Sequence, residues 1–264
     1  MDSKEYWAER QAKAQERITN KNIKETEKQL YRYYKKTMDN VVGQFHVVYS
    51  KVLSNIADGV SITPADLYKL DSYWKMQGQL KHELEKLGDK QISLLSEWLT
   101  EQYMSIYESI NIPNSGLSYS QISEEAVLQM INEIWCADGS SWSNRIWKNT
   151  DKLQQALNDN LIACVVSGSS TEELKQLLVH DFDIAYNRAD SIVRTEFAHI
   201  QTQASRKRYE DAGITEVEVW ADYDERRCDV CGKLHQKIYP VYAQMPIPAH
   251  PRCRCCIIPV VNID

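Results

Sequence analysis

The residue types best suited to bind a metal ion gather in two short segments of this 264-residue chain. The segment RRCDVCGKLH (226–235) places Cys228 and Cys231 two residues apart, and PAHPRCRCC (248–256) gives His250 and Cys253 the same spacing. Each spacing allows a tight turn that points two ligand atoms at one ion, and zinc takes four ligands at the corners of a tetrahedron. The sequence therefore predicts one zinc ion bound by Cys228, Cys231, His250 and Cys253.

Other interpretations of these cysteines are open at the level of sequence. Cys255 lies two residues beyond Cys253 and is a rival for the fourth ligand position. Cysteines are also often buried as small apolar residues, which we expect of Cys136 and Cys164. A thioredoxin-like redox pair would need a βαβ context, and a reducing compartment disfavours disulfides. Five of the seven cysteines fall within residues 228–256, and this clustering favours zinc.

The ligand types decide between a structural and a catalytic zinc. A catalytic zinc usually keeps three protein ligands and one open position beside a carboxylate base. Here sulfur dominates and four ligands are at hand, which favours a closed structural site and a protein that is not an enzyme. A zinc-dependent hydrolase is the alternative, because Asp222, Asp224 and Glu225 are close in sequence to the first cysteine pair.

Basic residues near the cysteines suggest a third function. Two basic groups could contact phosphates and make a nucleic-acid-binding zinc module: Arg206, Lys207 and Arg208, and Arg252 with Arg254. The net charge of −6 argues against DNA binding by the whole surface. In the same region Arg194 and Glu196 could pair with neighbouring elements and fix their helix to the zinc module.

Glycine and proline usage separates a helical body from a short terminal module. The chain has nine glycines, and five of its seven prolines lie at or after Pro240. We expect helices over residues 3–55, from Pro64 with Thr63 as N-cap, on either side of LGDKQ (87–91), from Ser123 to about 135, and over 143–166, 171–180 and 184–213. EVEVW (216–220) and KIYPVY (237–242) alternate like strands.

The N-terminal part of the first helix is nearly all polar. We therefore expect residues 3–37 to pack little against the rest of the chain and to gain order from a partner. The predicted fold is mainly α: an elongated multi-helix body with a small C-terminal α+β zinc-binding module. The predicted division is a long N-terminal helical segment (1–57), a helical body (58–183) and the zinc module (184–264).

Several motifs together resemble one known family. RTE (194–196), a long helix, YEDAG (209–213), VEVW (217–220), a D-x-R-x-C-x-x-C portion and finally P-x-HPRCRC (248–255) resemble the signature of the Mu F-like phage head morphogenesis proteins. Upstream, EYWAER (5–10) and GSSWSNRIWKNTDKLQQAL (139–157) resemble other segments of such proteins. In this portion Asp224, Arg226 and Cys228 stand at the D, R and first C positions; an alignment on Glu225 in place of Asp224 is the alternative and leaves the cysteines unchanged.

The resemblance implies a minor capsid protein of a phage or prophage that acts in head morphogenesis. Such a protein is expected at the portal or the inner capsid surface, with roles in DNA packaging or ejection. The implied partners are the portal protein, the major capsid or scaffolding protein and phage DNA, without a membrane. The implied location is the virion, in the head interior or portal region. The charged N-terminus shows no signal peptide, so we expect synthesis in the bacterial host cytoplasm.

Overall fold

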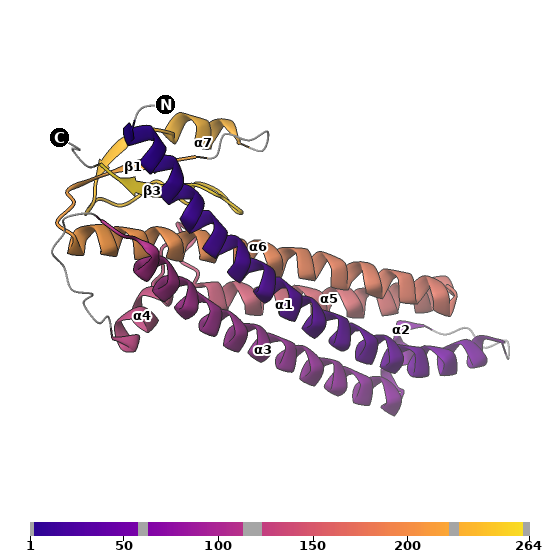
Figure 1. Cartoon of the computed structure of the whole chain (residues 1–264). Coiled ribbons are helices and arrows are strands. Elements are labelled where there is room, and N and C mark those ends of the chain that lie inside the picture. The colour runs from indigo at the N-terminus through magenta and orange to yellow at the C-terminus, as the bar shows by residue number, and fades with distance from the viewer. Residues whose placement is uncertain (1–2, 58–62, 113–122, 222–226, 261–264) are drawn as a thin grey trace. The chain divides into compact units, whose positions relative to one another are not determined.

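The computed structural model describes residues 3–57, 63–112, 123–221 and 227–260. The described chain is mainly helical, with a small sheet near its C-terminal end (Figure 1), which confirms the predicted mainly α class. In chain order the elements are α1 (Ser3–Ala57), α2 (Pro64–Tyr68), α3 (Asp71–Ser109), α4 (Glu124–Ile131), α5 (Trp142–Ser167), α6 (Thr171–Asp211), β1 (Glu216–Trp220), α7 (Asp229–Leu234), β2 (Ile238–Pro240) and β3 (Cys256–Pro259).

The sheet has three antiparallel strands in the order β2–β1–β3. Val217 of β1 lies opposite Tyr239 of β2 and Pro259 of β3, and Trp220 lies opposite Cys256. Alternate residues of β1 are buried, as its sequence pattern predicts. The strands β1 and β2 were predicted, whereas β3 was not.

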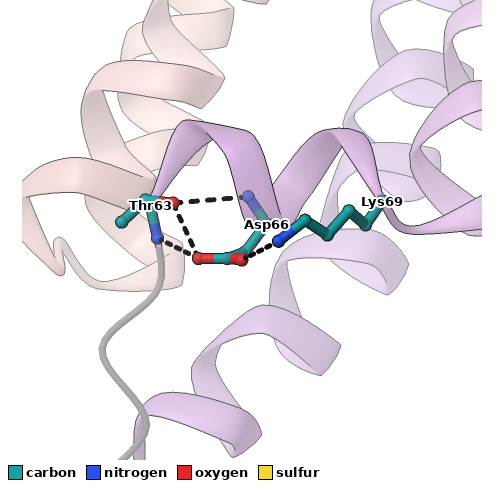
Figure 2. Close-up of polar contacts among 3 residues, drawn as sticks. All are labelled: Thr63, Asp66 and Lys69. Atoms are coloured by element: carbon teal, nitrogen blue, oxygen red, sulfur yellow. Dashed lines mark hydrogen bonds and ion pairs between the residues drawn. The ribbon is translucent and has the colours of Figure 1, made fainter.

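Local capping chemistry sets the start of several helices. Thr63 caps α2: its hydroxyl accepts from the backbone N–H of Asp66, whose carboxylate accepts in turn from the Thr63 backbone N–H at 3.0 Å (Figure 2). Lys69 adds a 2.9 Å ion pair to the same carboxylate. Ser170 and Glu173 form the predicted capping box at the start of α6. Gly213 follows α6 with φ of +74°, as expected of a C′ glycine.

Two predicted helix breaks are absent from the structure. Gly88 of LGDKQ lies inside α3, where it leaves room for Trp147: a Cβ built at Gly88 would be 2.4 Å from an atom of that ring. This glycine therefore serves packing and does not end a helix. The gap expected between 180 and 184 is also helical, because one buried apolar stripe runs through it: Leu174, Leu178, Phe182, Ala185 and Ala189.

The chain forms two compact units. One unit comprises residues 1–27, 95–142 and 191–264, and it contains the sheet, α4 and α7. The other comprises residues 28–94 and 143–190, and its buried core includes Val41, Phe45, Tyr49, Leu80 and Leu84. Among the described residues, no helix has the length and apolar content that crossing a membrane would require.

The expectation that residues 3–37 pack little against the chain is wrong. Within the first unit, α1 buries a stripe of uncharged side chains: Ala12, Gln15, Thr19, Asn22 and Thr26. Thr19 donates to Gln201 of α6 at 2.7 Å, and Gln102 of α3 donates to Thr19 at 2.6 Å. A polar composition suggests an exposed helix, but these side chains form hydrogen bonds with other polar groups and are buried together with them.

Candidate metal centre

Two segments on either side of β2 bring the predicted metal ligands together. Cys228 is the N-cap of α7, where its Sγ accepts the backbone N–H of Cys231 at 3.4 Å. Cys231 lies one turn into that helix and is buried. The second segment, which leads into β3, carries His250, Cys253 and Cys255. A short helix and a turn thus place donor atoms from residues 22 positions apart in one cluster.

The distances within the cluster are those of groups that share one small space. The Nε2 atom of His250 lies 3.3 Å from Sγ of Cys228 and 3.1 Å from Sγ of Cys231. Sγ of Cys231 lies 3.8 Å from Sγ of Cys253. The ligand atoms of Cys228, Cys231 and His250 all lie within 4.8 Å of one another, and so do those of Cys231, Cys253 and Cys255. Cys231 is therefore common to both groups.

The imidazole of His250 is oriented for metal binding. Its Nδ1 lies 2.8 Å from the carbonyl oxygen of Pro251, a contact that requires Nδ1 to carry the proton. In the neutral imidazole Nε2 is then the unprotonated nitrogen, and it is the ring atom that lies against the two sulfurs of the first segment. A histidine whose other nitrogen donates to a backbone carbonyl is the usual arrangement around a protein-bound metal.

The structure brings together five candidate ligands where zinc takes four. Cys253 and Cys255 are both buried, at 3% and 4% exposure. A cavity of about 40 Å³ is lined by Cys228, Cys231, His250 and Cys255 together with Ala221 and three arginines. A volume of this size accommodates a single ion or water molecule. Cys253 and Cys255 thus both remain candidates for the fourth zinc ligand.

The thiols differ in their affinity for protons. Burial raises the pKa of Cys231 to about 12. A hydrogen bond from the Cys255 thiol lowers the pKa of Cys253 to about 5 and raises that of Cys255. Backbone N–H donation from Cys231 lowers the pKa of Cys228. A cation that binds this cluster would replace the protons that its thiols hold.

Helix α6 anchors the loop that carries His250 and Cys253. The backbone N–H of Arg252, a residue with φ of +61°, donates to Oγ1 of Thr195 at 3.1 Å. Beside it, Arg194 forms an ion pair with Glu27 of α1, and Glu196 accepts from the indole N–H of Trp135 at 3.0 Å. Arg194 and Glu196 thus pair with neighbouring elements, but Glu27 and Trp135 lie outside the zinc module to which the pairing was expected to fix the helix. The loop contact of Thr195 was missed, because a threonine inside a helix carries no signal of a tertiary partner.

The basic cluster of α6 is largely engaged in the structure. Arg208 is buried, donates to the carbonyl of Ile110 at 3.2 Å and lies over the ring of Tyr107. Arg206 and Lys207 pair with acidic residues one turn later. Arg208 is therefore a structural cation and not a phosphate ligand. Cys164 is buried, as expected, whereas Cys136 is only partly buried. Asp222, Asp224 and Glu225 of the hydrolase alternative lie outside the described residues.

A cleft of about 460 Å³ adjoins the cysteine cluster. Its walls come from α1 (including Glu16, Thr19 and Asn20), from α6, from Trp220 of β1, and from the loop at 250–254. Arg252 and Arg254 are exposed there. The N-terminal part of α1 lies beside β1 and β3 (Figure 1), where Ala12 packs against Cys256 and Ile258.

Part of the chain is similar to a known protein family. Residues 155–258 match the family model described as phage Mu protein F like protein, a segment that includes all five candidate ligands. The match confirms the resemblance to the Mu F-like family that the sequence predicts. No solved structure matches this chain.

A curated relative adds a second similarity. The chain is 25% identical over 262 residues to the NAD(+)–arginine ADP-ribosyltransferase EFV of Enterococcus faecalis strain V583, across 91% of this chain and 52% of that protein. The chain thus spans about half the length of this relative. The expectation that the protein is not an enzyme is wrong in the form stated, because nearly the whole chain resembles a protein named as a transferase.

Proposed function

We propose that this chain is a minor head protein of a tailed phage or prophage, held in its working shape by one structural zinc ion. The observation that carries the proposal is the cluster of Cys228, Cys231 and His250 inside the segment that matches the Mu F-like family. The role includes association with the portal or the inner capsid surface and contact with phage DNA during packaging or ejection. Residues 184–264 would form the Mu F-like module, with 1–57 and 58–183 as helical segments.

The donor set fits a structural zinc. Cys228, Cys231, His250 and Cys253 offer three sulfurs and one nitrogen, the ligand types of closed zinc sites. Bound zinc would connect α7 to the loop before β3. Cys255 is the alternative fourth ligand, because its side chain lines the same small cavity as Cys228, Cys231 and His250.

Metal analysis and cysteine variants test the zinc site. Protein purified under reducing conditions should contain about one zinc per chain, and Cys228→Ser should lower that content and increase amide exchange over residues 227–260. Cys164→Ser, which removes a buried cysteine of the other unit, is the matched control and should keep the zinc. Comparison of Cys253→Ser with Cys255→Ser identifies the fourth ligand. Full order of residues 227–260 in protein free of metal would overturn the proposal.

Particle analysis tests the head role. If the chain is a minor head protein, purified phage heads should contain it in few copies, and heads made without the chain should be defective in assembly or in DNA delivery. Cross-linking in the intact head should connect it to the portal or inner capsid. Heads of normal composition and infectivity that lack the chain would contradict the assignment.

The curated relative supports a second candidate function, transfer of ADP-ribose from NAD⁺ to an arginine side chain. In such a reaction the bond to nicotinamide breaks and a bond to the guanidinium nitrogen forms. Purified chain should then release nicotinamide from NAD⁺ and label an arginine-containing acceptor. No turnover with the zinc-loaded chain would assign that activity to the half of the relative outside the match.

A further inference from the structure

One face of α1 carries cations and no exposed acid over four turns. From Arg10 to Lys24, all of which the structure describes, the exposed side chains are Arg10, Lys13, Ala14, Arg17, Asn20, Lys21 and Lys24. The glutamates of this stretch and its edge are half-buried: Glu9 pairs with Lys13, and Glu16 accepts from Asn20. A chain with net charge −6 thus presents a concentrated positive face.

The cations of this face are available to a ligand. Arg17, Lys21 and Lys24 have no ion-pair partner among the described residues, and Arg10 lies over the ring of the exposed Trp7. Their spacing of three, four and seven residues puts them in one row along the helix. The row is rigid, because the opposite face of the same turns is buried through Ala12, Gln15, Thr19 and Asn22.

The row borders the cleft beside the cysteine cluster. Asn20 belongs to both, since it is exposed next to the row and also lines the cleft. Arg252 and Arg254 line the same cleft and are exposed. The row on α1 therefore meets, at Asn20, the cleft that Arg252 and Arg254 line, and all of these residues belong to the first compact unit.

We propose that Arg10, Arg17, Lys21 and Lys24, with Arg252 and Arg254 at the adjoining cleft, bind the phosphate backbone of duplex DNA without regard to sequence. The inference rests on the proposed function in one respect, namely that a head protein meets packaged DNA. Lysine, arginine and asparagine are the side chains that contact phosphates. The row extends about 21 Å, and that length of duplex carries about twelve phosphate charges.

The composition of the face favours DNA over a protein partner or a membrane surface. The exposed face between residues 10 and 24 has no apolar side chain larger than alanine, whereas the cores of protein interfaces are depleted of lysine and enriched in aromatic residues. A helix that lies in a membrane surface needs a free apolar face. Here the face opposite the cations is already packed against the chain.

Salt-dependent binding to a labelled random-sequence duplex tests the proposal on the full chain. The quadruple variant R10Q/R17Q/K21Q/K24Q should bind at least tenfold more weakly at low salt. Its slope of log affinity against log salt should be shallower by up to about 3.6, since each phosphate contact contributes about 0.9. Arg252→Gln with Arg254→Gln should weaken binding further.

A matched control separates a local site from net charge. The variant K75Q/K81Q/K86Q/K90Q removes four exposed lysines from α3, and it should retain the wild-type slope. All substitutions are on exposed positions, and unchanged circular dichroism and melting temperature confirm the fold. Equal losses in both variants, no binding of wild-type protein at low salt, or equally tight binding to polyglutamate or anionic vesicles would each overturn the proposal. None of these outcomes bears on whether the chain is present in phage heads.

Discussion

Replacing Thr19 with valine should destabilise the unit that carries the metal centre. Thr19 is 7% exposed, and its hydroxyl takes part in two buried hydrogen bonds: it donates to Gln201 at 2.7 Å and accepts from Gln102 at 2.6 Å. Asn22 in turn donates to Gln102 at 2.9 Å. Valine has nearly the shape of threonine but no hydroxyl, so the substitution removes both hydrogen bonds without opening a cavity.

The magnitude follows from the two groups left behind. The substitution deprives an amide N–H of Gln102 and the amide oxygen of Gln201 of a partner in a buried environment. Each unpaired buried polar group costs about 1–3 kcal/mol, so we expect the two groups together to lower the free energy of unfolding by about 2–6 kcal/mol. At roughly 2–4 °C per kcal/mol, the melting temperature should fall by several degrees or more.

Urea unfolding measures the loss, and amide exchange locates it. Thr19→Ser is the matched control, because it keeps the hydroxyl and removes one methyl group, at a cost of roughly 1 kcal/mol. Exchange should accelerate in α1 between residues 12 and 26 in the valine variant and much less in the serine variant. If valine and serine destabilise the protein equally, the buried hydrogen bonds do not hold α1 in place and the reasoning fails.

Two further substitutions test packing and burial. Gly88→Ala should destabilise the protein by about 1–3 kcal/mol in thermal or urea unfolding, because the new Cβ would lie 2.4 Å from the ring of Trp147. Gly78→Ala in the same helix is the control: its new Cβ meets open space, so it should stabilise the protein by about 0.5–1 kcal/mol. A neutral Gly88→Ala would refute the close contact. Burial lowers the pKa of His199 to about 3, below its value of 6.5 in the unfolded chain. As the pH falls, the unfolded state therefore binds the proton first, and the stability of the fold decreases between about pH 6.5 and pH 3. His199→Phe should flatten that dependence by up to about 1.4 kcal/mol per pH unit, and an unchanged slope would contradict the assignment.

Features encoded by neighbouring residues could be predicted from the sequence. The caps at Thr63 and Ser170, the strand β1 and the C′ role of Gly213 each depend on residues a few positions apart. The convergence of the two cysteine segments could also be predicted. Each segment has two ligands at the spacing of one tight turn, and a zinc ion takes four ligands, so two such segments are needed. Features that depend on distant partners were missed: Gly88 reads as a helix breaker until Trp147 is placed against it.

The N-terminal half of α1 shows why polarity alone does not separate a buried helix face from an exposed one. Both faces between residues 10 and 26 are polar, yet one is buried and the other is not. The buried face uses short uncharged side chains, Gln15, Thr19, Asn22 and Thr26, at successive steps of four, three and four residues. The exposed face uses lysine and arginine.

The difference between the two faces follows from the cost of burial. An amide or hydroxyl can be paired inside a protein by one or two neighbouring groups, whereas a buried cation needs a counter-charge and several hydrogen bonds. A helical stripe of Gln, Asn and Thr beside a stripe of Lys and Arg is therefore a sequence signal for a helix packed through hydrogen bonds. The same division leaves the cations at the surface, where the proposed contact with DNA phosphates needs them.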